Sequence, residues 1–153
     1  MDYTTCPAVI LIADDDEDDF IMSRDALKRN KIRNEVYWVK NGIELLEYLR
    51  HQGEYSDSAA SPRPQLVLLD INMPKMNGLE ALKEIRQDPD LRHIPVVALT
   101  TSKSEEDVIR SYDLGVNSFV TKPVEFDGLV NVMHGLQDYW FQIVRIPDPP
   151  QIL

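Results

Sequence analysis

Cysteine is nearly absent from this chain: Cys6 is its single cysteine among 153 residues, so no internal disulfide can form. Long apolar runs are also missing, because no stretch approaches the roughly 20 consecutive apolar residues of a membrane-spanning helix. The N-terminus has no basic region ahead of its short apolar run, so no signal peptide is recognisable. These absences predict a soluble protein of the reducing cytoplasm.

Positive charge is scarce as well. The chain has 16 lysines and arginines against 26 aspartates and glutamates, which gives a net charge of −10 at pH 7. A domain that binds nucleic acid on its own normally presents a basic face, because phosphate contacts dominate its affinity. Anionic membranes likewise attract basic segments. The charge balance therefore predicts no direct binding of nucleic acid and no docking on a membrane.

Apolar residues are numerous enough for one hydrophobic core, at 43% of a chain whose length suits a single domain. We assign this domain to residues 8–144 and treat the proline-rich residues 145–153 as a C-terminal tail. The stretch 52–64 contains glycine, serine and proline, and it is expected to form a long exposed loop.

Short apolar segments alternate with stretches of helical periodicity. Three of these segments have no alternating polar residues, which is typical of strands buried on both faces of a parallel sheet. The predicted strands are 9–13, 36–39, 66–69, 96–99 and 118–121, and the predicted helices are 17–29, 42–51, 78–87, 104–114 and 125–144. The pattern predicts an α/β fold with a doubly wound, five-stranded parallel sheet, helices on both faces and right-handed crossovers.

Polar residues follow the predicted strands at the points where the strands end. Asp14 and Asp15 follow the first strand, and Asp70 follows the third. Thr100 ends the fourth strand and Lys122 follows the fifth. Because ligands of open parallel sheets bind beyond the carboxyl ends of the strands, we expect these five side chains to converge at one edge.

The predicted edge has a chemistry of its own. Three neighbouring carboxylates repel one another, and a divalent cation removes that repulsion. Mg²⁺ prefers oxygen ligands and often combines one or two carboxylates with a phosphate oxygen. A carboxylate can also act as a nucleophile and form an aspartyl phosphate, which Mg²⁺ and a lysine would stabilise. The residue types therefore favour Mg²⁺-dependent phosphoryl transfer.

Less specific explanations exist for the same residues. The acidic run 14–19 could be a solvated helix start, and Asp70 could be an ordinary turn residue. An EF-hand is excluded, because its sixth position would be Asp19 instead of glycine and its twelfth Asp25 instead of glutamate. The three histidines lack metal-ligand spacing, so we expect them to be structural or exposed. The strand-end position of the acids favours the functional interpretation.

Taken together, several motifs resemble the receiver domain of two-component response regulators. These motifs are Asp14-Asp15, Asp70 followed by Ile71-Asn72-Met73-Pro74 and Gly78, Thr100, and Lys122-Pro123. The separations of 30 residues from Asp70 to Thr100 and 22 from Thr100 to Lys122 also match. The resemblance covers about residues 8–143 and implies the flavodoxin-like sheet order 2-1-3-4-5. It further implies a signalling domain that a histidine kinase phosphorylates, and not a turnover enzyme.

The resemblance implies a role for each acidic position. Asp70 would be the phosphoacceptor. Asp15 would bind Mg²⁺ directly, and Asp14 would be its partner, acting largely through water. Asn72 would offer its backbone carbonyl to the metal, which Asp70 would also contact.

The resemblance also implies a switch. Thr100 would turn its hydroxyl toward the phosphoryl group, and Lys122 would pair with that group. Phe119 occupies the aromatic position that would move into the space left by Thr100. The bond between Lys122 and Pro123 would be cis, which an X–Pro bond tolerates at a cost of about 0.5–1 kcal/mol.

Three features depart from the common pattern. Phe119 has no phenol hydroxyl, Thr101 replaces a small residue, and the 52–64 loop is longer than in minimal receivers. That loop and the extended helix end at 137–141 resemble stand-alone regulators associated with bacterial phytochrome histidine kinases. This implies a sensor histidine kinase partner of the phytochrome type.

The C-terminal helix suggests a second partner. Tyr139, Trp140 and Phe141 are consecutive, so one helix face cannot bury all three. An exposed aromatic often marks a contact site, and we therefore expect a homodimer through this region. Too few residues follow position 144 to form an output domain, so signalling is expected to proceed through protein contacts.

Two other functions are open on the sequence alone. An aspartate-nucleophile phosphatase would also pair an aspartyl phosphate with Mg²⁺, but such enzymes have a second aspartate where this chain has Asn72. A receiver-shaped interaction module that takes no phosphate is the other alternative. Such modules usually lose an acid or the lysine, and this chain keeps Asp14, Asp15, Asp70 and Lys122.

Overall fold

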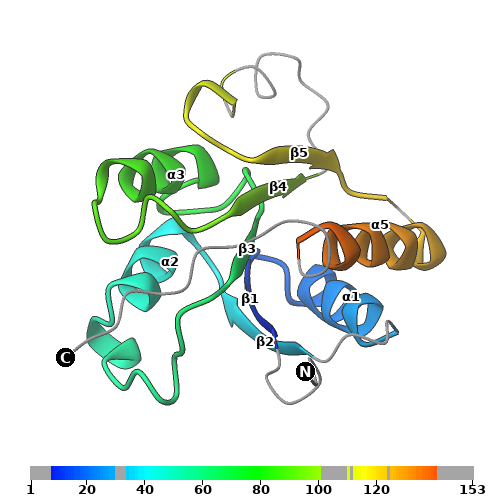
Figure 1. Ribbon diagram of the computed structural model, residues 1–153, viewed down its shortest axis with the longest axis horizontal. Coiled ribbons are helices and arrows are strands. Elements are labelled where there is room, and N and C mark those ends of the chain that lie inside the picture. Colours follow the sequence, from blue (N-terminus) through cyan, green and yellow to red (C-terminus); the bar gives the residue numbers. More distant parts are fainter. Residues whose placement is uncertain (1–7, 30–33, 101–109, 111, 124, 141–153) are drawn as a thin grey trace.

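The computed structural model describes residues 8–29, 34–100, 110, 112–123 and 125–140. Five parallel strands form one sheet in the order β2-β1-β3-β4-β5, which confirms the predicted order (Figure 1). The strands are β1 (Ala8–Ala13), β2 (Asn34–Val39), β3 (Leu66–Leu69), β4 (Val96–Thr100) and β5 (Ser118–Thr121). The helices are α1 (Glu17–Lys28), α2 (Gly42–Leu49), the short 3-10 helix η1 (Gly53–Tyr55), α3 (Gly78–Gln87) and α5 (Phe126–Asp138). Most of the predicted helix 104–114 and the whole tail 145–153 lie outside the described residues.

Different helices cover the two faces of the sheet, α1 and α5 on one side and α2 and α3 on the other (Figure 1). Successive strand residues point to opposite faces. In β1, Leu11 joins the core with α2 and α3, whereas Ile10 and Ile12 join the core with α1 and α5. Both faces are thus apolar, which is why the central strands lack alternating polar residues.

Polar caps start the first three helices. Asp16 begins α1 and accepts hydrogen bonds from the backbone N–H groups of Asp18 and Asp19. Asn41 caps α2 and Asn77 caps α3 in the same way. Each cap satisfies an N–H group that has no partner within its helix, a contribution of about 1 kcal/mol.

The segment 52–64 is a largely exposed loop, as the sequence predicts, but it is more ordered than expected. It contains η1, and its second half is fixed to residues at the end of α2. The Tyr48 hydroxyl donates a hydrogen bond to the Pro62 carbonyl at 2.8 Å, and His51 Nε2 lies 2.8 Å from the Ser61 carbonyl. Ser61 is consequently buried. The prediction of an exposed loop is confirmed for residues 52–54 and 56–60 and is wrong only at Ser61 and Pro64, which are buried.

The bond between Lys122 and Pro123 is trans, since no peptide bond among the described residues is cis. The cis bond implied by the resemblance is therefore wrong. An X–Pro bond prefers the trans form by about 0.5–1 kcal/mol unless its surroundings select the cis form. Lys122 still leaves the end of β5 toward the carboxyl edge of the sheet, where it contacts Asp14.

The end of α5 carries the predicted aromatic residues. Beyond Asp138 the helix continues as a wider π turn at Tyr139 and Trp140. Trp140 is buried with the α1 and α5 core, while Tyr139 is 47% exposed, which confirms that at least one aromatic points outward. Phe141 lies outside the described residues. No helix in the described part of the chain is long and apolar enough to cross a membrane.

Gly78 permits a close approach of two backbone segments. A Cβ atom at this position would lie 2.3 Å from the carbonyl oxygen of Asp70 and 2.9 Å from the Cα of Ile71. Both neighbours are backbone atoms, so no side chain can rotate away. The N–H of Gly78 also donates to the Ile71 carbonyl at 2.9 Å. The start of α3 therefore rests directly on the backbone that follows β3.

We predict that Gly78→Ala destabilises the fold, because the added methyl group displaces the backbone at Asp70. The expected loss is about 1–3 kcal/mol, typical of overpacking. Urea unfolding monitored by circular dichroism measures it. The matched control is Gly135→Ala in α5, where a Cβ meets nothing within 4 Å, and this change should stabilise the protein by about 0.5–1 kcal/mol. Equal effects at the two positions would contradict the close-approach explanation.

Candidate functional site

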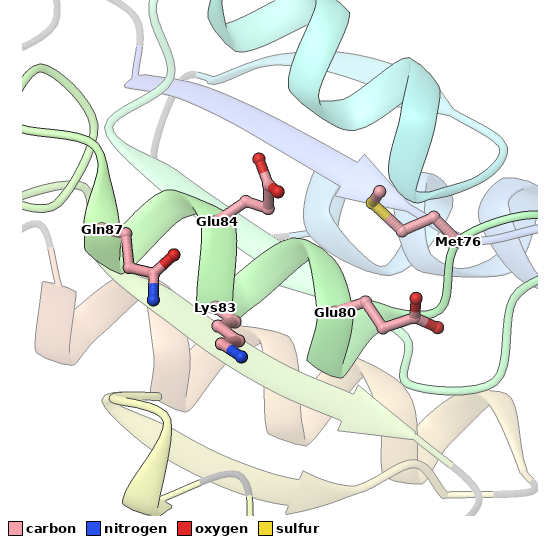
Figure 2. A pocket seen from close by; sticks show the side chains of 5 residues that line it. All are labelled: Met76, Glu80, Lys83, Glu84 and Gln87. Carbon is pink, nitrogen blue, oxygen red and sulfur yellow. The ribbon is translucent and has the colours of Figure 1, made fainter.

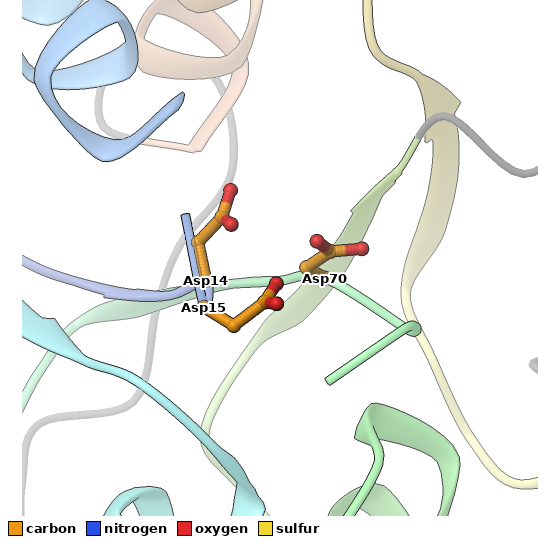
Figure 3. A group of neighbouring side chains, drawn as sticks. All are labelled: Asp14, Asp15 and Asp70. Atoms are coloured by element: carbon orange, nitrogen blue, oxygen red, sulfur yellow. The ribbon is translucent and has the colours of Figure 1, made fainter. Parts of the chain in front are cut away.

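The register of the sheet brings the predicted acids together. Ala13 of β1 is paired with Leu69 of β3, and the N–H of Asp70 donates to the Ala13 carbonyl at 2.9 Å. The residues that follow these two strands therefore leave the sheet side by side. Carboxylate oxygens of Asp14, Asp15 and Asp70 lie within 4.8 Å of one another (Figure 3).

The three carboxylates differ in exposure. Asp14 is buried at 3% exposure, Asp70 is half-buried, and Asp15 is exposed. An exposed carboxylate keeps free lone pairs for a ligand from solvent, whereas a buried one needs partners inside the protein. The acidic run 14–19 is therefore divided: Asp16 and its successors start α1, as the less specific explanation expected, while Asp14 and Asp15 belong to the edge cluster.

Asp14 is held by four hydrogen bonds from different elements. Its N–H donates to the Val39 carbonyl at 3.0 Å, and its own carbonyl accepts from the Trp38 indole at 2.7 Å. Its carboxylate accepts from the Asp16 N–H at 3.0 Å and from Lys122 Nζ at 2.8 Å. Both the backbone and the side chain of Asp14 are consequently fixed in place.

Lys122 is the cation of the site. Its side chain is buried, and its Nζ lies 2.8 Å from Asp14 Oδ2 and 3.6 Å from Asp19 Oδ2. Burial alone would lower the pKa of this ammonium group, but the hydrogen bond that it donates to Asp14 and the charges of Asp14, Asp70 and Asp19 outweigh burial and raise the pKa. The stabilisation is present below the ordinary lysine pKa and is lost only as pH rises through the raised value. Lys122 is therefore charged at neutral pH.

The other predicted residues are less completely defined. The N–H of Asn72 lies 3.3 Å from Asp70 Oδ1, so the turn after β3 folds back on the Asp70 side chain. Thr100 ends β4 opposite Thr121, but its side chain lies outside the described part of the structure. Phe119 is half-buried and packs against the core with α2 and α3.

Three contacts at the site were missed by the sequence analysis. Asp19 lies in the first turn of α1 and shares Lys122 with Asp14. Trp38 contacts the backbone of Asp14, and the Tyr112 hydroxyl accepts a hydrogen bond from the Phe119 N–H at 3.2 Å. Each joins residues of different elements, so no local motif reports them. Trp38 lies next to the last residue of β2 and pairs with Ile12 of β1, two residues before Asp14, and its place near the end of a predicted strand was the available signal.

The donor set suits Mg²⁺. Asp14, Asp15 and Asp70 offer carboxylate oxygens within 4.8 Å, and oxygen is the ligand that Mg²⁺ prefers. Lys122 supplies one positive charge against these three negative charges, so the cluster retains an excess of negative charge that a divalent cation would balance. The residues present therefore fit the ion.

A hollow lies along α3 (Figure 2). Its lining side chains are Met76, Glu80, Lys83, Glu84 and Gln87. It contains none of the predicted site residues.

Comparisons with known proteins agree with this geometry. A family model described as the response regulator receiver domain matches residues 10–134. The chain is 42% identical over 146 residues to Response regulator Rcp1 of Synechocystis sp., which covers 95% of this chain and 97% of that protein.

Solved structures are similar as well. The phosphorylated cyanobacterial phytochrome response regulator RcpA matches with a TM-score of 0.86 and 38% identity, covering 94% of this chain and 100% of that chain. The Mn²⁺-bound form of Rcp1 matches with a TM-score of 0.83 and 42% identity, covering 93% and 100%. With the family match spanning most of its length and these relatives sharing its fold, the chain belongs to the response regulator receiver domain family, whose members are signalling domains and not turnover enzymes.

Proposed function

We propose that this chain accepts a phosphoryl group on Asp70 from a sensor histidine kinase, in a Mg²⁺-dependent reaction, and signals through altered protein contacts. The observation that carries the proposal is the cluster of Asp14, Asp15 and Asp70, whose carboxylate oxygens lie within 4.8 Å. The buried ammonium of Lys122, 2.8 Å from Asp14, completes a charge arrangement suited to a phosphoryl group.

In the proposed transfer, an oxygen of the Asp70 carboxylate attacks the phosphorus atom of a phosphohistidine. The new O–P bond replaces the N–P bond, and the leaving imidazole keeps the electron pair and can take a proton from solvent. Mg²⁺, when bound, neutralises charge on the transferred oxygens. Asp15 is exposed and suits direct metal binding, together with Asp70 and the Asn72 carbonyl. Asp14 already accepts two hydrogen bonds on its carboxylate, so its contribution is mainly charge, acting through water.

Phosphorylation would change the partners of Lys122. An aspartyl phosphate adds negative charge close to its ammonium group, which can then move from Asp14 toward the phosphoryl oxygens. Thr100 would turn its hydroxyl to the same group, and the ring of Phe119 would fill the space that this opens. A local change of charge would thus alter the surface around β4 and β5.

The partner we propose is a histidine kinase of the phytochrome type. The support is the similarity to RcpA, which is a cyanobacterial phytochrome response regulator. We further propose that the domain comprises residues 8–144 and that it assists its own phosphorylation and dephosphorylation. The net charge of −10 favours output through proteins over direct contact with nucleic acid or membranes. The cytoplasmic location stays a prediction.

Asp70→Asn should abolish phosphorylation and leave the fold intact, because the amide has no nucleophilic carboxylate. The measurement is intact mass after incubation with acetyl phosphate, with and without Mg²⁺. Wild-type protein should gain one phosphoryl mass only with Mg²⁺. The matched control is Asp18→Asn, which changes an exposed acid in the first turn of α1 and should label fully. Full labelling of Asp70→Asn would mean a different acceptor, and an unlabelled wild type would favour a module that works without phosphate.

Lys122→Ala should still permit some phosphorylation but uncouple it from the change at Phe119, because the cation that follows the phosphoryl group is gone. The readout is the amide NMR shift of Phe119 before and after phosphorylation. Lys83→Ala, which removes an exposed lysine on α3, serves as the control and should keep the full shift. A complete Phe119 transition in Lys122→Ala would show that the coupling does not depend on this lysine.

We also propose a homodimer through the C-terminal helix region, supported by the 47% exposure of Tyr139. Its ring lies edge-on to the buried Trp140, with centroids 5.3 Å apart, so the exposed tyrosine is in contact with the core. Tyr139→Glu should weaken the dimer affinity about tenfold or more, roughly the loss of an aromatic contact. Analytical ultracentrifugation measures this as a lower dimer fraction. Ile43→Glu alters another exposed apolar side chain, at 42% exposure on α2, and should have no effect. A monomeric wild type, or equal dimerisation of both variants, would rule out this interface.

A further inference from the structure

The indole of Trp38 is joined to the backbone of the acidic cluster. Its Nε1–H donates to the carbonyl oxygen of Asp14 at 2.7 Å, at the short end of the range for N–H···O bonds. An indole nitrogen can only donate, so the direction of this bond is fixed. The paired residues of β1 and β2 end at Ala13 and Val39, and the indole therefore binds the first carbonyl beyond the ladder.

This bond affects the orientation of Asp15, because Asp14 and Asp15 share a peptide unit. The Asp14 carbonyl and the Asp15 N–H belong to one planar peptide unit. Since the N–H of Asp14 is held by Val39 at 3.0 Å and its carbonyl by Trp38, the orientation of the following peptide is restricted at both ends of Asp14. The direction of the Asp15 side chain depends on that orientation. Asp15 is exposed, and no packing would otherwise fix it.

The indole itself is held by its neighbours. The ring of Phe20 in α1 stacks on Trp38 with centroids 4.8 Å apart and planes 4° from parallel. Lys40 Nζ lies 5.2 Å from the ring centroid of Trp38, within the range of a cation–π contact. Phe20 is buried, so the stack is anchored in the core. The donor is consequently rigid, as a group that orients another must be.

We propose that Trp38 is a positioning residue of the metal site: through its hydrogen bond to the Asp14 carbonyl it orients the Asp14–Asp15 peptide and so presents the Asp15 carboxylate to a divalent cation. The inference rests on the proposed function only for its use in phosphoryl transfer. Metal affinity tests it independently. Residues that orient metal ligands typically change affinity by about 10–100-fold when they are removed.

The chain supplies a matched control, because it contains a second tryptophan. Trp140 Nε1 is buried and has no hydrogen-bond partner among the described residues, whereas Trp38 Nε1 binds Asp14. Trp38→Phe and Trp140→Phe are therefore the same chemical change, with and without the loss of a hydrogen bond. Both keep an aromatic ring, so both should fold.

The experiment is a titration of each protein with Mg²⁺ alone, followed by the amide NMR shifts of Asp15 and Asp70 well below the melting temperature. Trp38→Phe should weaken Mg²⁺ binding by about tenfold, the lower end for an orienting residue. Trp140→Phe should stay within about twofold of the wild type, as expected of a core change far from the ligands. A purely structural role for Trp38 would lower the melting temperature but leave the Mg²⁺ affinity unchanged, and that result would overturn the proposal. Equal weakening in both variants would overturn it too.

If Trp38→Phe does not fold, a replacement that preserves the shape of the ring tests the same hydrogen bond. In the Trp140→Phe background, β-(3-benzothienyl)alanine incorporated at the remaining tryptophan keeps the ring and replaces its N–H with sulfur. Weaker Mg²⁺ binding by this protein than by its Trp140→Phe parent would support the proposal, and equal binding would overturn it.

The two hypotheses fail in distinguishable ways. If the wild type binds Mg²⁺, loses affinity on Trp38→Phe and takes no phosphoryl group from acetyl phosphate, the positioning role stands and the proposed function fails. If the wild type is phosphorylated and Trp38→Phe binds Mg²⁺ normally, the function stands and the positioning role fails. A wild type that binds no Mg²⁺ would overturn both.

Discussion

The crowding of three carboxylates at one edge of the sheet is the constraint on which the rest of the site depends. The strands that carry them are paired by backbone hydrogen bonds, so Asp14 and Asp70 cannot separate to relieve their repulsion. Lys122 compensates for part of this charge from within the protein, at 2.8 Å from Asp14. The negative charge that Lys122 does not compensate can be balanced by a divalent cation. A phosphoryl group would later change the distribution of charge at this edge.

The two sides of this edge differ in how firmly their residues are held. On the β1 side, Asp14 is fixed by bonds from β2, the start of α1 and Lys122. On the other side, β5 is an edge strand whose residues are only partly buried, and Lys122 and Phe119 are attached to it. Edge elements with fewer buried contacts rearrange at lower cost than central strands. The proposed metal site thus lies on the rigid part of the sheet and the proposed switch on its adaptable part.

Much of this arrangement could be predicted from the sequence. Unbroken apolar runs identified β1, β3 and β4, because strands covered by helices on both faces have no solvent-exposed face and therefore no alternating polar residues. The acids that directly follow β1 and β3 identified the edge cluster, because parallel strands end together. The resemblance supplied the sheet order, which spacing alone would not have given.

What could not be predicted are contacts between residues far apart in the chain. The burial of Ser61 depends on contacts from Tyr48 and His51. The pairing of Asp19 with Lys122 depends on how α1 packs against α5, the helix that follows β5. The trans bond at Pro123 contradicts a feature taken from the resemblance, because the isomer is selected by local surroundings that a motif does not encode. Trp38 belonged to a plausible strand in the sequence, and only the register of β1 and β2 brings its indole to Asp14.

In the proposed function, the phosphoryl group resides on Asp70. The most direct test is to phosphorylate the wild-type protein, reduce it with borohydride, which converts an aspartyl phosphate to homoserine, and map the peptides by mass spectrometry. We expect homoserine at position 70 and at no other aspartate. Homoserine at another acidic residue of the edge cluster, or none at all in a protein that carries the added mass, would contradict it.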